Sequence, residues 1–281
     1  MNTARLFAVL ALALALGRGA CAGKDSCFDC HRVMEGTSRV YTNDIHFAIS
    51  ISCATCHGGD QNETNMNIAM NASRGFKLRV QRPAVPEFCG HCHGDRAYMG
   101  RYEDNPRVDQ LAKYQSGVHG RLLAGGRKRA AECIDCHGIH NIRKVDDPLS
   151  SASPERIAQT CAKCHESTAE AYAYTPHGLL FVDKARPGCT VCHSSHEMAP
   201  ATVAMLSGSS SVCVRCHKPG SSAAKLAEDM AQFLSNLEAA GPASKDALNR
   251  ARVAVHSLNL AALKQAAKPL SSSPDSNDKN N

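Results

Sequence analysis

The chain has 281 residues, fifteen cysteines and no tryptophan, and aromatic residues make up only 5% of it. A conventional globular core of this size would need more large apolar side chains, so we expect the apolar bulk to come from another source. The formal net charge of +6 does not by itself indicate nucleic-acid binding, and no nucleic-acid partner is expected.

The N-terminus is typical of a secretory signal peptide. Arg5 precedes an apolar run at residues 6–16, and the Ala-Cys-Ala sequence at 20–22 fits a cleavage site. The apolar run is too short to span a bilayer. A lipid anchor at Cys21 is the alternative, although Arg18 stands where a lipoprotein signal has Leu. We therefore expect an exported, periplasmic protein, with an outer-membrane-associated or extracellular location as the alternatives.

Seven copies of Cys-x-x-Cys-His follow along the chain. Two thiols three positions apart can reach the two vinyl groups on one haem edge, and the next residue then offers an imidazole to the iron. Structural zinc, thioredoxin-like motifs and disulfides also use paired cysteines, but none requires His after every pair. The motifs, numbered one to seven, are Cys27/Cys30/His31, Cys53/Cys56/His57, Cys89/Cys92/His93, Cys133/Cys136/His137, Cys161/Cys164/His165, Cys189/Cys192/His193 and Cys213/Cys216/His217. The pattern predicts seven covalently bound haems of type c.

A second phrase, Tyr-x4-His, recurs between the haem motifs, and its second and third copies continue with Gly. The copies begin at Tyr41, Tyr114 and Tyr172 and end at His46, His119 and His177. This repeat divides the chain into three two-haem modules, with motif seven standing alone. Modules two and three each carry one more histidine, His140 and His196, three residues after a motif histidine; module one has Asp60 there.

These phrases resemble the multihaem cytochromes with doubled Cys-x-x-Cys-His motifs. Such cytochrome c3-like proteins are found in the periplasm and on the outer surface of metal-, sulfur- and sulfate-reducing bacteria. The resemblance rests on the paired motifs, the Tyr-to-Gly phrase at 114–120 and Cys-x-x-Cys-His-x-x-His, and it covers about residues 24–220. It implies a mainly α fold with extensive irregular loops, organised around a chain of haems, with little or no sheet.

Seven histidines remain besides the seven that end the motifs, as many as there are predicted haems, which suggests bis-histidine iron throughout. They are His46, His91, His119, His140, His177, His196 and His256. His140 and His196 lie too close to their own motifs to reach the opposite haem face, so each should serve a neighbouring haem. The alternative for each of the seven is a surface or hydrogen-bonding role, above all for His91 inside its motif and His256 on a helix.

Methionine is the rival axial ligand. The candidates are Met66, Met70, Met99, Met198 and Met205. Module one lacks the extra histidine, so it is the place where we would look for a methionine-ligated or five-coordinate haem.

The remaining segments complete the predicted organisation. Residues 60–88 are read as a loop with a short strand at 76–80. Apolar residues at helical spacing predict a helix over 222–240, and a second helix capped by Ser244 is expected to run to about residue 267. These helices would form a lid over the last haems or a device that binds a partner. The predicted organisation comprises a signal peptide (1–22), a seven-haem region (23–220), a C-terminal helical hairpin (221–269) and a disordered tail (270–281).

The leading functional hypothesis is electron transfer without substrate chemistry, in anaerobic respiration, because bis-histidine iron has no open coordination site. The expected partners are other redox proteins: cytochromes, a quinol-linked membrane complex or a terminal reductase. One alternative is a reductase of a small oxyanion or of hydroxylamine with one open haem. Others are a soluble haem subunit of a membrane quinol-oxidising complex, and an oligomer or haem filament.

Overall fold

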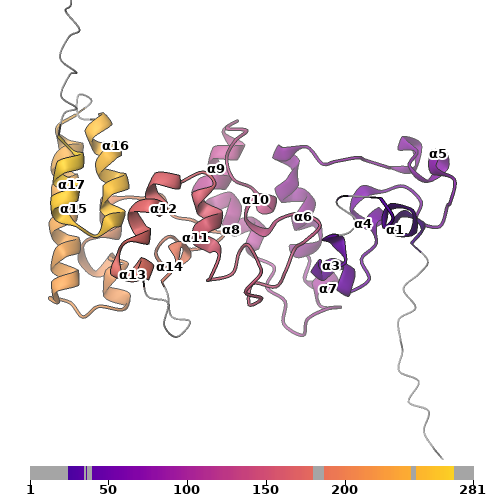
Figure 1. Ribbon diagram of the computed structural model, residues 1–281, viewed down its shortest axis with the longest axis horizontal. Coiled ribbons are helices and arrows are strands. Elements are labelled where there is room, and N and C mark those ends of the chain that lie inside the picture. Colours follow the sequence, from indigo (N-terminus) through magenta and orange to yellow (C-terminus); the bar gives the residue numbers. More distant parts are fainter. Residues whose placement is uncertain (1–24, 35, 37–39, 180–186, 242–244, 269–281) are drawn as a thin grey trace, which may run out of the picture. The chain divides into compact units, whose positions relative to one another are not determined.

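The computed structural model describes residues 25–34, 36, 40–179, 187–241 and 245–268. Within these ranges the chain forms short helices joined by irregular loops, and no strand occurs (Figure 1). This confirms the mainly α fold. The strand predicted at 76–80 is wrong, because the N–H of Lys77 donates to the carbonyl of His57, 2.7 Å away, and the segment joins no ladder. The predicted signal peptide, Ser244 and the predicted tail lie outside the described residues.

The chain divides into two compact units. Unit 1 comprises residues 1–39 and 50–78, and unit 2 comprises residues 40–49 and 79–281. The division falls inside the predicted seven-haem region, and the C-terminal helices belong to unit 2. Motifs one and two therefore lie in unit 1, and motifs three to seven lie in unit 2.

Unit 1 is built around a shared helix cap. One carboxylate oxygen of Asp25 accepts from the N–H groups of Cys27 and Phe28, and the other accepts from the N–H of Cys53, 3.2 Å away. An aspartate at this position satisfies the free N–H groups of a helix start. Asp25 thus holds the first cysteines of motifs one and two at a common point. The helices of unit 1 are α1 (Ser26–His31), α4 (Cys53–His57), α5 (Met66–Ala69) and η1 (Ala72–Arg74).

Unit 2 contains short helices in its haem-motif region and longer ones at its C-terminal end. The short ones are α3 (Ile45–Ala48), η2 (Arg82–Ala84), α6 (Val85–His93), α7 (Arg96–Met99), α8 (Gln110–Ser116), α9 (Val118–Ala124), α10 (Cys133–His137), α11 (Ile157–Ala162), α12 (Glu166–Ala173), α13 (Pro176–Leu179), α14 (Cys189–His193), η3 (Val203–Met205), η4 (Gly208–Ser210) and η5 (Cys213–Arg215). The C-terminal elements are α15 (Ser222–Ala239), α16 (Lys245–Ala254), η7 (Val255–Ser257) and α17 (Leu260–Ala266).

The C-terminal helices pack side by side and contain the main apolar cluster of the described residues (Figure 1). Met230 and Leu234 of α15 meet Ala251 of α16 and Leu263 of α17, and all four are at least 96% buried. The second helix was expected to continue to about residue 267, and that expectation is wrong. The chain breaks at Leu258, whose φ of 51° lies in the left-handed region. The side chain of the following residue, Asn259, then caps α17.

Apolar side chains beside the haem motifs are exposed. Val33 is 80% exposed two residues after motif one, and Ile139 is 57% exposed two residues after motif four. Val191 inside motif six is 46% exposed. Among the described residues, no helix is both long and apolar enough to cross a membrane.

Candidate functional site

Each haem motif forms a single helical turn. Motifs one, two, three, four and six lie within helices, namely α1, α4, α6, α10 and α14. In motifs five and seven the N–H of the histidine donates to the carbonyl of the first cysteine, 2.9 Å away in both cases, which closes the same turn. Residues three apart on a helix share a face. The two thiols of a motif therefore point the same way, as attachment to one haem edge requires.

The predicted haem-binding cysteines differ in burial, and the second cysteine is exposed in four of the seven motifs. Cys56 is exposed on α4, whereas Cys53 of the same motif is half-buried. The second cysteines of motifs one, five and seven are exposed in the same way, namely Cys30, Cys164 and Cys216. A haem attached there would itself lie over the exposed thiol.

Five motif histidines in unit 2 each face a histidine from outside the motifs. The ring centroids of every pair lie 5.9–6.3 Å apart. Each pair joins one motif histidine to one predicted distal ligand. The pairs are His93 with His46, His137 with His196, His165 with His119, His193 with His256, and His217 with His177.

This separation fits one iron atom between two imidazoles. A bond from an imidazole nitrogen to a metal is about 2 Å long, and the nitrogen lies about 1 Å from its ring centre, so two ligated rings stand about 6 Å apart. Five independent pairs within 0.4 Å of one another point to a common spacer. The residues present therefore fit haem iron with two axial histidines.

The electrostatics of these rings also suit metal ligation. Burial lowers the pKa of seven paired histidines, which keeps the rings neutral, the form that binds a metal. They are His93, His119, His137, His177, His193, His196 and His256. The Nδ1 atom of His196 is buried and has no hydrogen-bond partner among the described residues. A polar nitrogen in that position is costly unless it binds something.

The histidines of the three Tyr-x4-His repeats face their partner motifs in a regular order. His46 of module one faces motif three, His119 of module two faces motif five, and His177 of module three faces motif seven. Each repeat thus extends its histidine to the first motif of the following module. Each of these histidine pairs therefore joins a repeat to a motif that lies further along the chain.

The tyrosine and glycine of the repeat position this histidine. The hydroxyl of Tyr114 donates to the carbonyl of Ala131, and that of Tyr172 donates to the carbonyl of Pro187; each acceptor lies two residues before a motif. A Cβ atom on Gly120 would collide with the carbonyl oxygen of Tyr114, and one on Gly178 would collide with that of Tyr172. The repeated glycine is therefore needed where the chain turns back on the tyrosine. Sequence reasoning found the repeat but missed these roles.

Consecutive motifs in unit 2 interact through their cysteines. The thiol of Cys133 is hydrogen-bonded to Cys89, and that of Cys161 to Cys189; these contacts, with burial, raise the pKa of both thiols. The first contact joins motif three to motif four, and the second joins motif five to motif six. Electrostatic interactions extend the series, joining motif four to five (Cys136 with Cys161 and Cys164) and motif six to seven (Cys192 with Cys213 and Cys216).

The other predicted ligands have different surroundings. His31 and His57 lie in unit 1, whose sequence contains no further histidine. The Nδ1 atom of His57 lies 3.0 Å from the carbonyl oxygen of Lys77. In unit 2, His140 packs edge-on against Tyr41 with centroids 6.2 Å apart, and His91 is exposed on α6.

In unit 1 the two motifs also lie close together. Burial, followed by the charge of Asp25 and then by Cys27, raises the pKa of Cys53 to about 12. Met66, a candidate axial ligand in this unit, is 63% exposed on α5.

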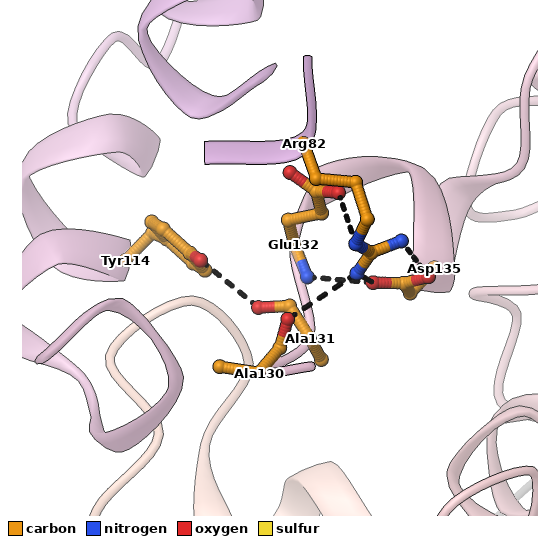
Figure 2. Close-up of polar contacts among 6 residues, drawn as sticks. All are labelled: Arg82, Tyr114, Ala130, Ala131, Glu132 and Asp135. Atoms are coloured by element: carbon orange, nitrogen blue, oxygen red, sulfur yellow. Dashed lines mark hydrogen bonds and ion pairs between the residues drawn. The ribbon is translucent and has the colours of Figure 1, made fainter. Parts of the chain in front are cut away.

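An ion-pair cluster joins η2, which precedes the helix of motif three, to the helix of motif four (Figure 2). The Nε atom of Arg82 lies 3.0 Å from a carboxylate oxygen of Glu132, and its Nη2 atom lies 2.7 Å from Asp135. Arg82 begins η2, which leads directly into α6, and the two acidic residues lie at the start of α10. The side chain of Glu132 is fully buried, and that of Arg82 is 42% exposed. Sequence reasoning did not find this cluster, because its members lie about fifty residues apart.

The pKa values of the two carboxyl groups in this cluster are shifted in opposite directions. Burial raises the pKa of Glu132 despite the neighbouring Arg82. Burial acts in the same direction on Asp135, but hydrogen bonds from Arg82 and from the N–H of Glu132 outweigh it and lower the pKa of Asp135. The cluster thus fixes where α10 begins and holds it against the segment that leads into α6.

Comparison with known proteins agrees with this geometry. Residues 45–166 match the family model described as cytochrome c3. This segment contains motifs two to five, and it includes His46, His119 and His140. No curated protein and no solved structure matches the chain.

Proposed function

We propose that this chain, a cytochrome c3-like multihaem c-type cytochrome, carries seven covalent haems and passes electrons along them between redox partners in anaerobic respiration. The observation that carries the proposal is the set of five histidine ring pairs at one common separation. An iron with two histidines has both axial positions filled, so it exchanges electrons without binding a substrate. A reductase would need an open axial position, and each of these five pairs supplies both ligands.

The proposed axial ligands in unit 2 follow the ring pairs. His46 would serve the haem of motif three, His196 that of motif four, His119 that of motif five, His256 that of motif six and His177 that of motif seven. His196 would then serve motif four although its own module carries motif six, as its short distance from His193 requires. Haem supplies the redox chemistry, and the protein sets the position and potential of each haem.

The contacts between motifs support conduction through unit 2. Electron tunnelling falls steeply with distance, so a carrier must keep neighbouring haems close. Hydrogen bonds between cysteines at two junctions, and electrostatic interactions between them at the other two, connect motifs three to seven in sequence order. The pKa of His137 is lowered in part by His93, and that of His193 in part by His165, so ligands of neighbouring haems also interact. We infer that electrons follow the order of the motifs in the sequence.

The proposal includes a periplasmic location and other redox proteins as partners. The location is supported by the signal-peptide pattern at residues 1–22. A cytochrome without substrate chemistry must receive its electrons from one protein and deliver them to another. The expected partners are other cytochromes, a quinol-linked membrane complex or a terminal reductase.

Substituting a proposed distal ligand is expected to change the spin state of one haem. His256→Ala removes the partner of His193 in a region where α16 has already ended. The haem of motif six should then lose its sixth ligand, and one low-spin signal in the electron paramagnetic resonance spectrum of the oxidised protein should become high-spin. The remaining low-spin signals should persist.

His91→Ala is the matched control, because it removes an exposed imidazole from α6. The spectrum of this variant should equal that of the unsubstituted protein. An unchanged spectrum for His256→Ala, with seven haems present, would show that His256 is not a ligand. That outcome would remove the basis for assigning ligands from the ring pairs.

A further inference from the structure

The histidine pair at motif three differs from the other four pairs in the hydrogen bonds that one of its rings makes. The Nδ1 atom of His46 lies 2.9 Å from a carboxylate oxygen of Asp44. The same oxygen accepts from the backbone N–H of His46, and the other carboxylate oxygen accepts from the N–H of Ile142, 2.7 Å away. The side chain of Asp44 is only 1% exposed. Asp44 is therefore fixed at both oxygens and cannot turn away from the ring.

A carboxylate is a stronger acceptor than a backbone carbonyl. The Nδ1 atom of His256 lies near the carbonyl oxygens of Arg252 and Val253, at 3.1 and 3.2 Å. Among the ten paired histidines of unit 2, only His46 contacts a carboxylate within the described residues. Because Asp44 occupies Nδ1, the Nε2 atom of His46 is the nitrogen left for a metal on the side of His93.

This contact changes the strength of His46 as a ligand to iron. A histidine that donates its second N–H to a carboxylate becomes a more basic ligand. A more basic ligand, with a buried negative charge behind it, stabilises ferric iron more than ferrous iron. Arg143 and Lys144 line the same surface cavity as Asp44, but Arg143 is paired with Asp147 at 2.8 Å. The negative charge of Asp44 is thus directed chiefly at His46.

We propose that Asp44 is a positioning residue that makes the haem of motif three the hardest to reduce of the five in unit 2. The inference rests on the proposed function, since it requires a haem between His46 and His93. Motif three lies at one end of the series of contacting motifs in unit 2. An electron on this haem therefore loses free energy by moving to the haem of motif four, which makes motif three the donor end of that series.

The test replaces Asp44 by asparagine in the complete haem-loaded protein. Asparagine has the same shape and remains a good helix cap, so α3 should still begin at Ile45. We expect one reduction potential, assigned to motif three by its changed low-spin resonance, to rise. Outer-shell partners of metal-bound histidines typically alter metal affinity tenfold or more. A tenfold shift in the reduction equilibrium corresponds to about 59 mV for a one-electron couple.

Asp95→Asn is the matched control. Asp95 lies two residues after His93, is exposed, and caps α7 by accepting from the N–H groups of Ala97 and Tyr98. Its substitution removes one negative charge near the same haem without altering a ligand's hydrogen bond. The potential should move much less than in D44N, and the low-spin resonance positions should stay unchanged. Equal shifts in the two variants would mean that only net charge matters, and would overturn the proposal.

A second variant, Asp44→Ser, separates tuning from simple support of the fold. Serine also caps helices but presents a neutral oxygen, so the potential should rise as in D44N while the haem stays low-spin. An unchanged potential in both variants, or a high-spin haem in both, would overturn the tuning role. Failure of the proposed function would look different: the unsubstituted protein would then lack haem on the Cys89–Cys92 peptide in mass spectrometry.

Discussion

Removing both cysteines of motif six, as Cys189→Ala with Cys192→Ala, is expected to slow electron exchange between the haems of motifs five and seven by orders of magnitude. Motif six interacts with both neighbours, since Cys189 is hydrogen-bonded to Cys161 and Cys192 interacts electrostatically with Cys213. If motif six has no haem, electrons must tunnel from the haem of motif five to that of motif seven in a single longer step. Rapid-mixing reduction of the protein, followed optically, should show a fast phase from the haems before the break and a slow one after it.

The control removes motif seven in the same way, as Cys213→Ala with Cys216→Ala. This site ends the series, so exchange among motifs three to six should stay fast, although the protein loses one haem in each case. The far-ultraviolet circular dichroism of both variants should retain the signal of the C-terminal helices. Equal reduction kinetics in the two variants would show that electrons do not follow the order of the motifs.

Arg82→Ala is expected to destabilise the protein by about 2 kcal/mol, less than the full cost of breaking a buried ion pair because Arg82 is half-exposed. The substitution leaves Glu132 buried with its charge unpaired and frees Asp135 at the start of α10. It also loosens the attachment of α10 to the segment leading into α6. Chemical denaturation of the holoprotein, followed by circular dichroism, measures the free energy of unfolding.

Lys113→Ala is the control for this effect, because Lys113 and Asp109 form an exposed pair on α8. Its loss should cost only about 0.3–0.5 kcal/mol. Adding Glu132→Gln to Arg82→Ala should recover part of the lost stability, since a buried amide carries no charge. If Arg82→Ala costs no more than Lys113→Ala, the cluster does not hold the two motifs together.

The destabilisation by Arg82→Ala should also depend on pH in a known direction. Burial raises the pKa of Glu132 in the folded protein above its ordinary value, so the folded state binds this proton more tightly than the unfolded state does. The contribution of Glu132 to stability is then greatest below its unfolded pKa and declines as pH rises through its folded pKa. Losing Arg82 should raise the folded pKa further, so the loss of stability should grow from acidic to neutral pH.

The sequence alone could predict the covalent chemistry because that chemistry is local. The spacing of Cys27, Cys30 and His31 fits within one helical turn, so each motif indicates haem attachment even when the fold is unknown. The Tyr-x4-His repeat was visible for the same reason. The mainly α architecture was expected from the resemblance of the repeated motifs to multihaem cytochromes. The exposure of Cys56 could not be read from its motif, because burial depends on what the rest of the chain packs against.

The ligand pairing could not be predicted because it depends on contacts across modules. His46 and His93 are separated by 47 positions, and nothing in the local sequence of either indicates the other. His256 is harder still, because its position depends on the break at Leu258, where a continuous helix was expected. Asp44 was not singled out for the same reason, since its role appears only once His46 has a partner.

The most direct test of this account is the mass of the intact mature protein, measured under denaturing conditions that release every non-covalent ligand. Each covalently attached haem adds about 0.6 kDa. We expect an excess of roughly 4 kDa over the polypeptide, with one haem on each of the seven Cys-x-x-Cys-His peptides after proteolysis. A mass equal to that of the bare chain, or disulfides in place of haem at these cysteines, would contradict the account.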